Sequence, residues 1–326
     1  MSLRGRLALL VGALLILFGI GSTAFAQTSS TGGSGLSISP TRFDLTIDKG
    51  QQSTIQLTLK NISGTDIVAK SAINDFESNG VSGEPRIITD PTKQSSASIR
   101  NFLVGVTDLP LAKDESKTIT VQVSVPQNAA PGAYYGIIRY AAVRNGQTSG
   151  GSNQVSLTAS VGAVVLVTVP GNITQQVKLV SIQAFKNITD NTSSSFFLSA
   201  PKAIGIELQN LGNGFSSPFG RVSIKDMFGK EVFNYELNSG DPRGVILPNS
   251  SRLFKDSVKG ISMPGRYTIT GNISYGSGGD ILISTGTFWY LPVWLIVVLV
   301  ILLVVLIGLG YVLYRRLRRP VHKHAK

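Results

Sequence analysis

Strict alternation of apolar and polar positions recurs through the middle of the chain. It is clearest in "TRFDLTI" (residues 41–47), "STIQLTLKNI" (53–62) and "KTITVQVSV" (117–125). A period of two is typical of β-strands that bury one face. Turn signals separate such segments at intervals near ten residues, which predicts an antiparallel β-sandwich. Between the two terminal segments we find no helical period.

The order of these segments occurs twice. Each half runs through a strand, an Asn and Gly turn, a strand, a Leu-Pro pair, a strand, a Pro-Gly-x-Tyr strand, a Gly-rich turn and a last strand. We therefore expect an all-β chain of two tandem immunoglobulin-like antiparallel β-sandwiches, residues 36–170 and 171–290. Residues 27–35 are expected to be a flexible leader, and Gly50 should take a positive φ in its turn.

The two Pro-Gly-x-Tyr segments place Tyr134 and Tyr267 at the start of a penultimate strand. Sandwich folds put a tyrosine there whose ring joins the core while its hydroxyl ties down the corner. We therefore predict a structural role for both tyrosines.

The strand in "APGAYYGIIRY" (130–140) is apolar on both faces. Aligned on the Pro-Gly, its outward positions Tyr135, Ile137 and Arg139 match the polar Thr268, Thr270 and Asn272 of the second half. These three residues are candidates for partner binding. Two covers are open: the chain's own segment 71–103, with Phe76, Ile87, Ile88 and Phe102, or a partner surface or the second domain.

The two ends have different roles. Residues 1–26 read as a secretory signal peptide, with Arg4 and Arg6, an apolar run and "AFA" before the cleavage point; an uncleaved anchor is the alternative. Residues 291–314 are predicted to be a transmembrane helix, because Val293–Leu313 is uncharged and spans about 31 Å as a helix. Residues 315–326 form a basic tail.

Aromatic and basic residues border the predicted span. They indicate a single pass through a cell membrane, with the N-terminal domains extracellular and the tail cytoplasmic. The tail and the signal peptide hold eight of the positive charges, so the formal +12 leaves about +4 between them. We therefore expect the lipid bilayer, and no nucleic acid, as a partner. The predicted interface residues are Trp289, Tyr290, Trp294, Tyr311, Tyr314, Arg315 and Arg316.

The chemistry of most enzymes is missing. Both histidines, His322 and His324, lie in the tail, and the chain has no cysteine, which excludes His- and Cys-based catalysis and most zinc sites. A cysteine-free exterior also favours a bacterial source. The acids Asp75, Glu77, Glu84 and Asp90 read as loop charges, and Asp66 with Asp75 and Glu77 lacks a calcium-loop spacing. We predict no enzyme, no catalytic residue, no cofactor and no metal.

The order of segments, with "ISPTRFDLTIDKGQQSTIQLTLKN" (38–61) and the stretch 126–140 as its best-matching parts, resembles the WxL-interacting protein family of Gram-positive cell surfaces. That resemblance implies an N-terminal domain that engages peptidoglycan, a membrane-proximal domain that engages other surface or host proteins, and no enzymatic activity.

Three functions stay open. The first is a non-catalytic, membrane-anchored surface protein whose domains bind cell-wall polymer or surface and host proteins. The second is a structural subunit of a cell-envelope or secretion complex that acts through its helix and tail. The third is a cell-wall glycan enzyme that would depend on Glu84 or Asp75.

Overall fold

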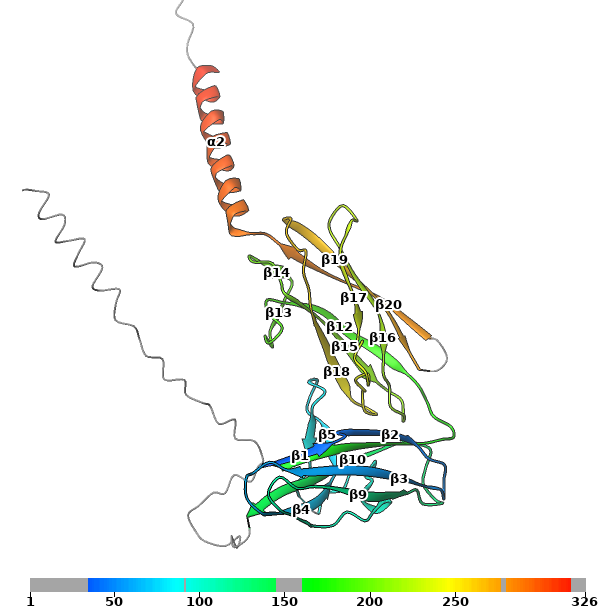
Figure 1. The fold of residues 1–326 in the computed structure, drawn as a ribbon. Coiled ribbons are helices and arrows are strands. Elements are labelled where there is room, and N and C mark those ends of the chain that lie inside the picture. The colour runs from blue at the N-terminus through cyan, green and yellow to red at the C-terminus, as the bar shows by residue number, and fades with distance from the viewer. Residues whose placement is uncertain (1–34, 91, 145–159, 277–279, 318–326) are drawn as a thin grey trace, which may run out of the picture.

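The computed structural model describes residues 35–90, 92–144, 160–276 and 280–317 (Figure 1). The described chain is mostly β, which confirms the expected all-β class, and its only helices are the short turn η1 and the C-terminal α2. The elements are β1 (Leu36–Ser39), β2 (Arg42–Thr46), β3 (Gln52–Asn61), β4 (Ile67–Asn74), β5 (Phe76–Ser78), β6 (Pro85–Ile87), η1 (Arg100–Phe102), β7 (Leu103–Val104), β8 (Leu109–Leu111), β9 (Ser116–Ser124), β10 (Gly132–Arg144), β11 (Ser160–Val169), β12 (Val177–Phe185), β13 (Ser193–Ser194), β14 (Phe196–Phe197), β15 (Ala203–Asn210), β16 (Phe219–Lys225), β17 (Glu231–Leu237), β18 (Ser251–Ser257), β19 (Gly265–Tyr275), β20 (Asp280–Tyr290) and α2 (Val293–Leu317).

Two pairs of sheets form two sandwiches. The first sandwich has sheets in the order β1-β3-β9-β7 and β2-β11-β10-β4-β8, and the second has β13-β12-β15-β18 and β14-β20-β19-β16-β17. The two long, adjacent strands β10 and β11 of the first sandwich occupy the same places in their sheet as β19 and β20 in the second. The repeat in the sequence is therefore a repeat of topology. The strands of the two sandwiches end at Val169 and begin at Val177. The domain boundary at Pro170 stays a prediction.

The expectation of purely antiparallel sheets is wrong at one edge of each sandwich. β2 pairs in parallel with β11, and β14 pairs in parallel with β20. The turn around Gly50, whose φ is 72° as expected, does not close a hairpin. It carries the chain from β2 in one sheet to β3 in the other, and this change of sheet places β2 beside the last strand.

Each sandwich has its own apolar core, and each core includes the strand that follows the Pro-Gly. Ile138 and Tyr140 are fully buried in the first core and Tyr267 and Ile269 in the second. The hydroxyl of Tyr134 donates to the carbonyl of Ala130 (3.1 Å), and that of Tyr267 donates to Met263 (2.7 Å). Both tyrosines thus take the corner role predicted for them.

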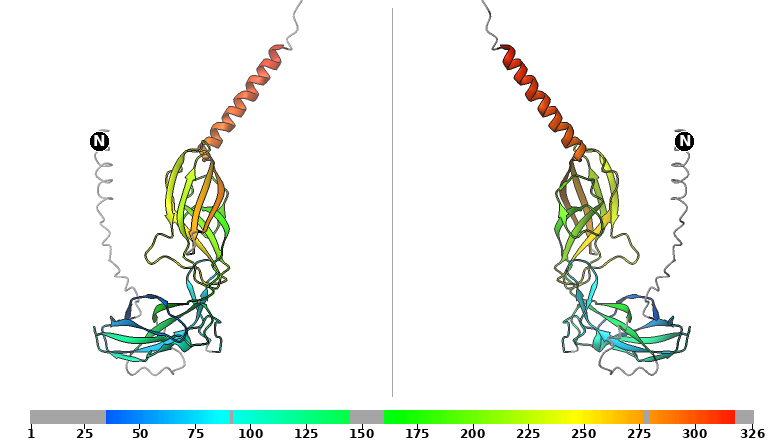
Figure 2. Two further views of the ribbon diagram at one scale, coloured as in Figure 1. Left: turned by 90° about the vertical axis from the view of Figure 1, so that its right-hand side faces the viewer. Right: turned by 90° about the vertical axis from the view of Figure 1, so that its left-hand side faces the viewer.

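The second sandwich stands on the first with its long direction crossing that of its neighbour, and α2 leaves from its far end (Figures 1 and 2). α2 is long and apolar enough to cross a membrane: Val293–Arg315 has a mean hydropathy of 3.3 and none of it is buried. The predicted signal peptide, all of the leader except Gly35, and the tail beyond Leu317 lie outside the described residues.

Candidate functional site

The outer face of β10 lies at the junction of the two sandwiches. Tyr135 and Ile137 are 8% and 7% exposed and belong to an apolar cluster separate from both cores. Arg139 is half-buried on the same face. The cover of this face comes from the same chain and has two sources.

The first source is the hairpin of β5 and β6, which rises from the first sandwich. The ring of Phe76 lies 5.0 Å from that of Tyr135, and Ile87 packs against the cluster. Phe102 was expected to join them, but this expectation is wrong. Its ring lies 4.9 Å from Tyr134 and is buried in the first core, because η1 turns it to the inner face of β10.

The second source is the second sandwich. The ring of Phe215 lies 6.0 Å from that of Tyr135, and Leu247 and Val245 complete the cluster. Both covers considered from the sequence are therefore present at once. Binding of a separate partner by Tyr135, Ile137 and Arg139 stays a prediction.

Hydrogen bonds fix the junction at three places. The carbonyl of Val81, at the tip of the β5–β6 hairpin, accepts from the amide of Leu253 on β18 (2.8 Å). The guanidinium of Arg42 donates to the carbonyl of Arg243 (2.8 Å). The main-chain carbonyl of Asn213, in the second sandwich, accepts from the main-chain amide of Ala133 on β10 (2.9 Å). The two sandwiches therefore meet through a specific, bonded surface and not through a linker alone.

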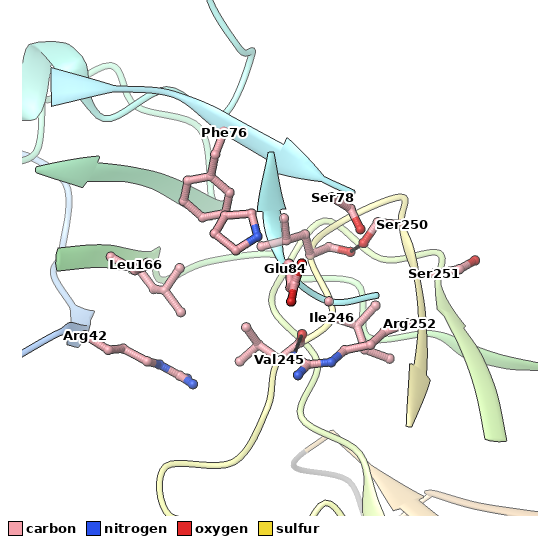
Figure 3. Close-up of a pocket in the computed structure, with 14 residues that line it drawn as sticks. Arg42, Phe76, Ser78, Glu84, Leu166, Val245, Ile246, Ser250, Ser251 and Arg252 are labelled. Atoms are coloured by element: carbon pink, nitrogen blue, oxygen red, sulfur yellow. Dashed lines mark hydrogen bonds between the residues drawn. The ribbon is translucent and has the colours of Figure 1, made fainter. Parts of the chain in front are cut away.

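A cavity of about 150 Å³ remains within this junction. Its walls are mostly apolar, with Phe76 and Leu166 from the first sandwich and Val245 from the second. Arg42 and Arg252 extend into it from opposite sides (Figure 3). Small-molecule pockets usually have about 300–1,000 Å³, so this cavity fits a side chain or a small group better than a substrate.

Three charged side chains line the cavity: the guanidinium groups of Arg42 and Arg252 and the carboxylate of Glu84. Burial is the main cause that lowers the pKa of the Arg252 guanidinium, and nearby Arg42 lowers it further. Arg252 donates to the carbonyl of Val245 (2.9 Å), and Arg42 is paired with Asp44. For the neutral phenol of Tyr135, burial acts in the other direction and raises the pKa. Because Arg42 is already paired with Asp44, Arg252 is the guanidinium that the mostly apolar walls offer to a ligand carboxylate.

The loop acids named from the sequence have separate local partners. Asp75 is fully buried and accepts from the amide of Ser95 (3.0 Å) and the hydroxyl of Ser98 (2.7 Å), with Arg100 at 3.3 Å. Glu77 lies on β5 and not in a loop as expected, and it pairs with Arg86 across the β5–β6 hairpin. Asp75 therefore organises its loop.

The remaining acids are similarly dispersed. Asp90 accepts from both the amide and the hydroxyl of Thr92, which lowers its pKa. Asp66 accepts from the amide of Lys113, and Glu84 lines the junction cavity. Within the described ranges no three acids or histidines gather as metal ligands.

Two buried asparagines were not singled out in the sequence. The amide of Asn61 donates to the carbonyls of Thr65, Leu111 and Ala112, and that of Asn210 donates to Gly214 and Ile246. They are the asparagines of the repeated Asn and Gly turn. Their side-chain hydrogen bonds join each turn to the Leu-Pro segment of the same sandwich. Arg42, Arg252 and Asn213 were also missed, because nothing in their local pattern marks them as junction residues.

The predicted membrane-interface residues fall on β20 and α2. Trp289 is 45% exposed and Tyr290 is half-buried against the second core. On α2, Trp294 lies in the first turn, Tyr311, Tyr314 and Arg315 lie near the other end, and Arg316 is also part of the helix. Their contact with lipid stays a prediction.

No protein-family model and no curated protein sequence matches this chain. Among solved structures it is similar to the class 5 fimbriae chaperone CfaA, at 13% identity over 78% of this chain and 100% of that one, with a TM-score of 0.37. The Pseudomonas aeruginosa CupB2 chaperone has 10% identity over 78% and 100%, with a TM-score of 0.35. The E. coli chaperone DraB has 14% identity over 76% and 97%, with a TM-score of 0.33. Identities and TM-scores this low do not assign a function to this chain.

Proposed function

We propose that this chain is a non-catalytic, membrane-anchored binding protein whose two sandwiches act as one unit on the extracellular side. The observation that carries the proposal is the bonded junction, where Arg42 and Arg252 face a small apolar cavity. The apolar α2 supports the anchor. The separate local partners of Asp75, Glu77 and Asp90 favour binding over catalysis.

On the first sandwich, where the resemblance places peptidoglycan binding, a protein partner fits the described surface better than a cell-wall polymer. Sugars stack on exposed aromatic rings, yet the large apolar side chains exposed on the described part of the first sandwich are Ile62, Val81 and Val104, none of them aromatic. A side chain with an apolar stem and a terminal carboxylate, carried by a surface protein, suits the cavity in size and charge. Peptidoglycan binding, implied by the resemblance to WxL-interacting proteins, is the second candidate, and that membership is itself a proposal.

The test compares two ligands for the same protein. The mature chain in detergent micelles is sedimented with purified peptidoglycan and, separately, used to capture proteins from a membrane and surface extract. We expect protein capture without sedimentation, and we expect capture to survive deletion of residues 318–326. Sedimentation with peptidoglycan would favour the second candidate. Capture that depends on the tail would favour the structural subunit of an envelope complex.

The enzyme alternative has its own assay. Incubation of the mature chain with cell-wall glycans should release no fragments, and the variants Asp75→Asn and Glu84→Gln should behave like the unaltered protein. Release of fragments that either variant abolishes would overturn the non-catalytic proposal.

A further inference from the structure

The end of the second sandwich from which α2 leaves has a surface that the binding function does not use. β20 ends at Tyr290 and α2 begins at Val293, so two residues join them. The amide of Leu291 in this link donates to the carbonyl of Phe197 (2.9 Å). The three residue steps from Tyr290 to Val293 span about 10–11 Å at most. If α2 spans a bilayer, as proposed above, the bilayer surface lies against this end.

The turn between β16 and β17 presents two large apolar side chains to solvent at this end. Met227 is 55% and Phe228 is 76% exposed, the highest value among the large apolar side chains of the described residues. The turn is nevertheless fixed. The carboxylate of Asp226 accepts from the amides of Phe228 (2.9 Å) and Lys230 (3.0 Å). An ordered turn that holds a phenylalanine in water is costly unless something covers the ring.

Strand register places this turn level with the start of α2. Lys225 pairs with Thr268, and Thr268 pairs with Thr287 on β20, so residues beyond Lys225 reach the level at which β20 ends. β16 is two strands from β20, a lateral distance of about 10 Å. A Cβ added to Gly265 would lie 2.6 Å from the sulfur of Met227, so the turn rests on the first residue of β19. The views agree that the turn and α2 share one end (Figures 1 and 2).

Further exposed apolar side chains stand on β20 itself and at its other neighbour, β14. Phe196 on β14 is 48% exposed, Leu198 is 51% exposed, and Trp289, paired with Phe196, is 45% exposed. Met263, in the loop before β19, is 55% exposed. Together these residues flank the start of α2 and are called the collar below: Phe196, Leu198, Met227, Phe228, Met263 and Trp289.

Positive charge surrounds the collar. Lys225, Lys230, Lys259 and Arg266 are exposed at this end, and none lies within 4 Å of a carboxylate among the described ion pairs. Glu231, the nearby acid beside Lys225, is paired with Arg221 (2.9 Å). The carboxylate within the turn, that of Asp226, is engaged by backbone amides. Apolar side chains surrounded by lysine and arginine are the composition of a surface that inserts shallowly into an anionic bilayer.

We propose that the collar is a membrane-docking surface, and that its occupant is the surface of the bilayer that holds α2. Phe228 and Met227 insert to the depth of the lipid headgroups, and the four basic residues contact anionic lipid. This second attachment, beside α2, fixes the tilt of the paired sandwiches above the membrane. The proposal rests on the membrane span proposed for α2, and the experiment separates the two.

The natural chain has no cysteine, so single labels can be placed cleanly. The full mature chain is reconstituted in nanodiscs of phosphatidylcholine with phosphatidylglycerol, carrying an environment-sensitive fluorophore at Phe228→Cys. Ile283→Cys, 73% exposed on β20, is the matched control on the same sandwich, and Leu303→Cys reports α2. Lipid-borne nitroxides quench labels in the bilayer, and aqueous iodide quenches labels in water.

The label at Phe228→Cys should be quenched several-fold more by lipid nitroxide than the label at Ile283→Cys, and its emission should shift to the blue. This quenching should weaken in phosphatidylcholine alone, and in a variant with Lys225, Lys230 and Lys259 changed to glutamine. Equal iodide quenching at Phe228→Cys and Ile283→Cys overturns the docking surface. If Leu303→Cys is then still quenched by lipid, the span stands alone; if it is not, both proposals fail.

Discussion

The amide of Leu253 on β18 donates a 2.8 Å hydrogen bond to the carbonyl of Val81, so a hairpin of the first sandwich is bonded to an edge strand of the second. An open sheet edge pairs readily with other chains, and this contact occupies part of one. The bond is formed by the tip of the β5–β6 hairpin, whose base covers Tyr135. One short excursion thus both closes the face of β10 and positions the second sandwich.

Two glycines of the hairpin tip allow a matched test of this contact. Gly80 and Gly83 both have positive φ, but a Cβ at Gly83 would lie 2.3 Å from Nε of Arg252, whereas one at Gly80 meets nothing within 4 Å. Both alanine variants incur a similar backbone cost, on the order of 1 kcal/mol. We expect Gly83→Ala alone to broaden the distance distribution between spin labels at Ile62→Cys and Ile283→Cys. Equal distributions for the two variants would contradict a junction fixed by this tip.

The buried asparagines should contribute strongly to stability. Asn61→Ala and Asn210→Ala each leave buried carbonyls without donors, for which we expect a loss of about 2–3 kcal/mol in the free energy of unfolding. Asn272→Ala, at an exposed position of β19, is the control and should be near neutral. Urea denaturation measures all three. Losses below about 0.5 kcal/mol at both buried sites would show that water replaces these bonds.

The corner tyrosine Tyr267 and the half-buried Tyr235 should respond differently to loss of the hydroxyl. Tyr267 donates to Met263, whereas the buried hydroxyl of Tyr235 has no hydrogen-bond partner. Tyr267→Phe should therefore cost about 1 kcal/mol, and Tyr235→Phe should be neutral or stabilising. The unfolding temperatures of the two variants, compared with that of the unaltered chain, test this difference. A larger loss for Tyr235→Phe would mean that its hydroxyl is bonded in solution.

Asp256 and Asp90 should give opposite dependences on pH. Burial raises the pKa of Asp256, so the folded chain binds this proton more tightly and loses stability as pH rises above about 4. Asp256→Asn should therefore stabilise the folded chain at pH 7, by less than about 1 kcal/mol because the side chain is half-exposed. Near pH 3 the same variant should have little effect on stability.

Asp90 provides the contrasting case. Its hydrogen bonds from Thr92 lower its pKa, so its contribution is present above about pH 4 and is lost as pH falls further. Asp90→Asn should destabilise at pH 7 and converge with the unaltered chain in acid. Urea midpoints between pH 3 and 7 check both variants, and the same sign for the two would contradict these environments.

Local patterns in the sequence were sufficient for the long strands, the repeat and the corner tyrosines, because period two and the Pro-Gly-x-Tyr spacing reflect contacts between near neighbours. They missed the short β5–β6 hairpin, which reads as a loop. They also showed that Tyr135 and Ile137 need a cover. They could not choose the cover, since Phe76, Phe215 and Leu247 come from distant segments that only the tertiary fold brings together. The parallel edge strand β2 was missed for the same reason: an alternating strand reads alike in either orientation.

The most direct test of the proposed function fills the junction cavity. Val245→Trp, in the full mature chain, occupies the space between Arg42 and Arg252, and Ile283→Trp adds the same ring at an exposed site. Both variants should unfold near the temperature of the unaltered chain, and the measurement is capture of surface proteins from a membrane extract. We predict that Val245→Trp loses the captured partner while Ile283→Trp retains it. Full capture by a folded Val245→Trp would contradict a binding site at the junction.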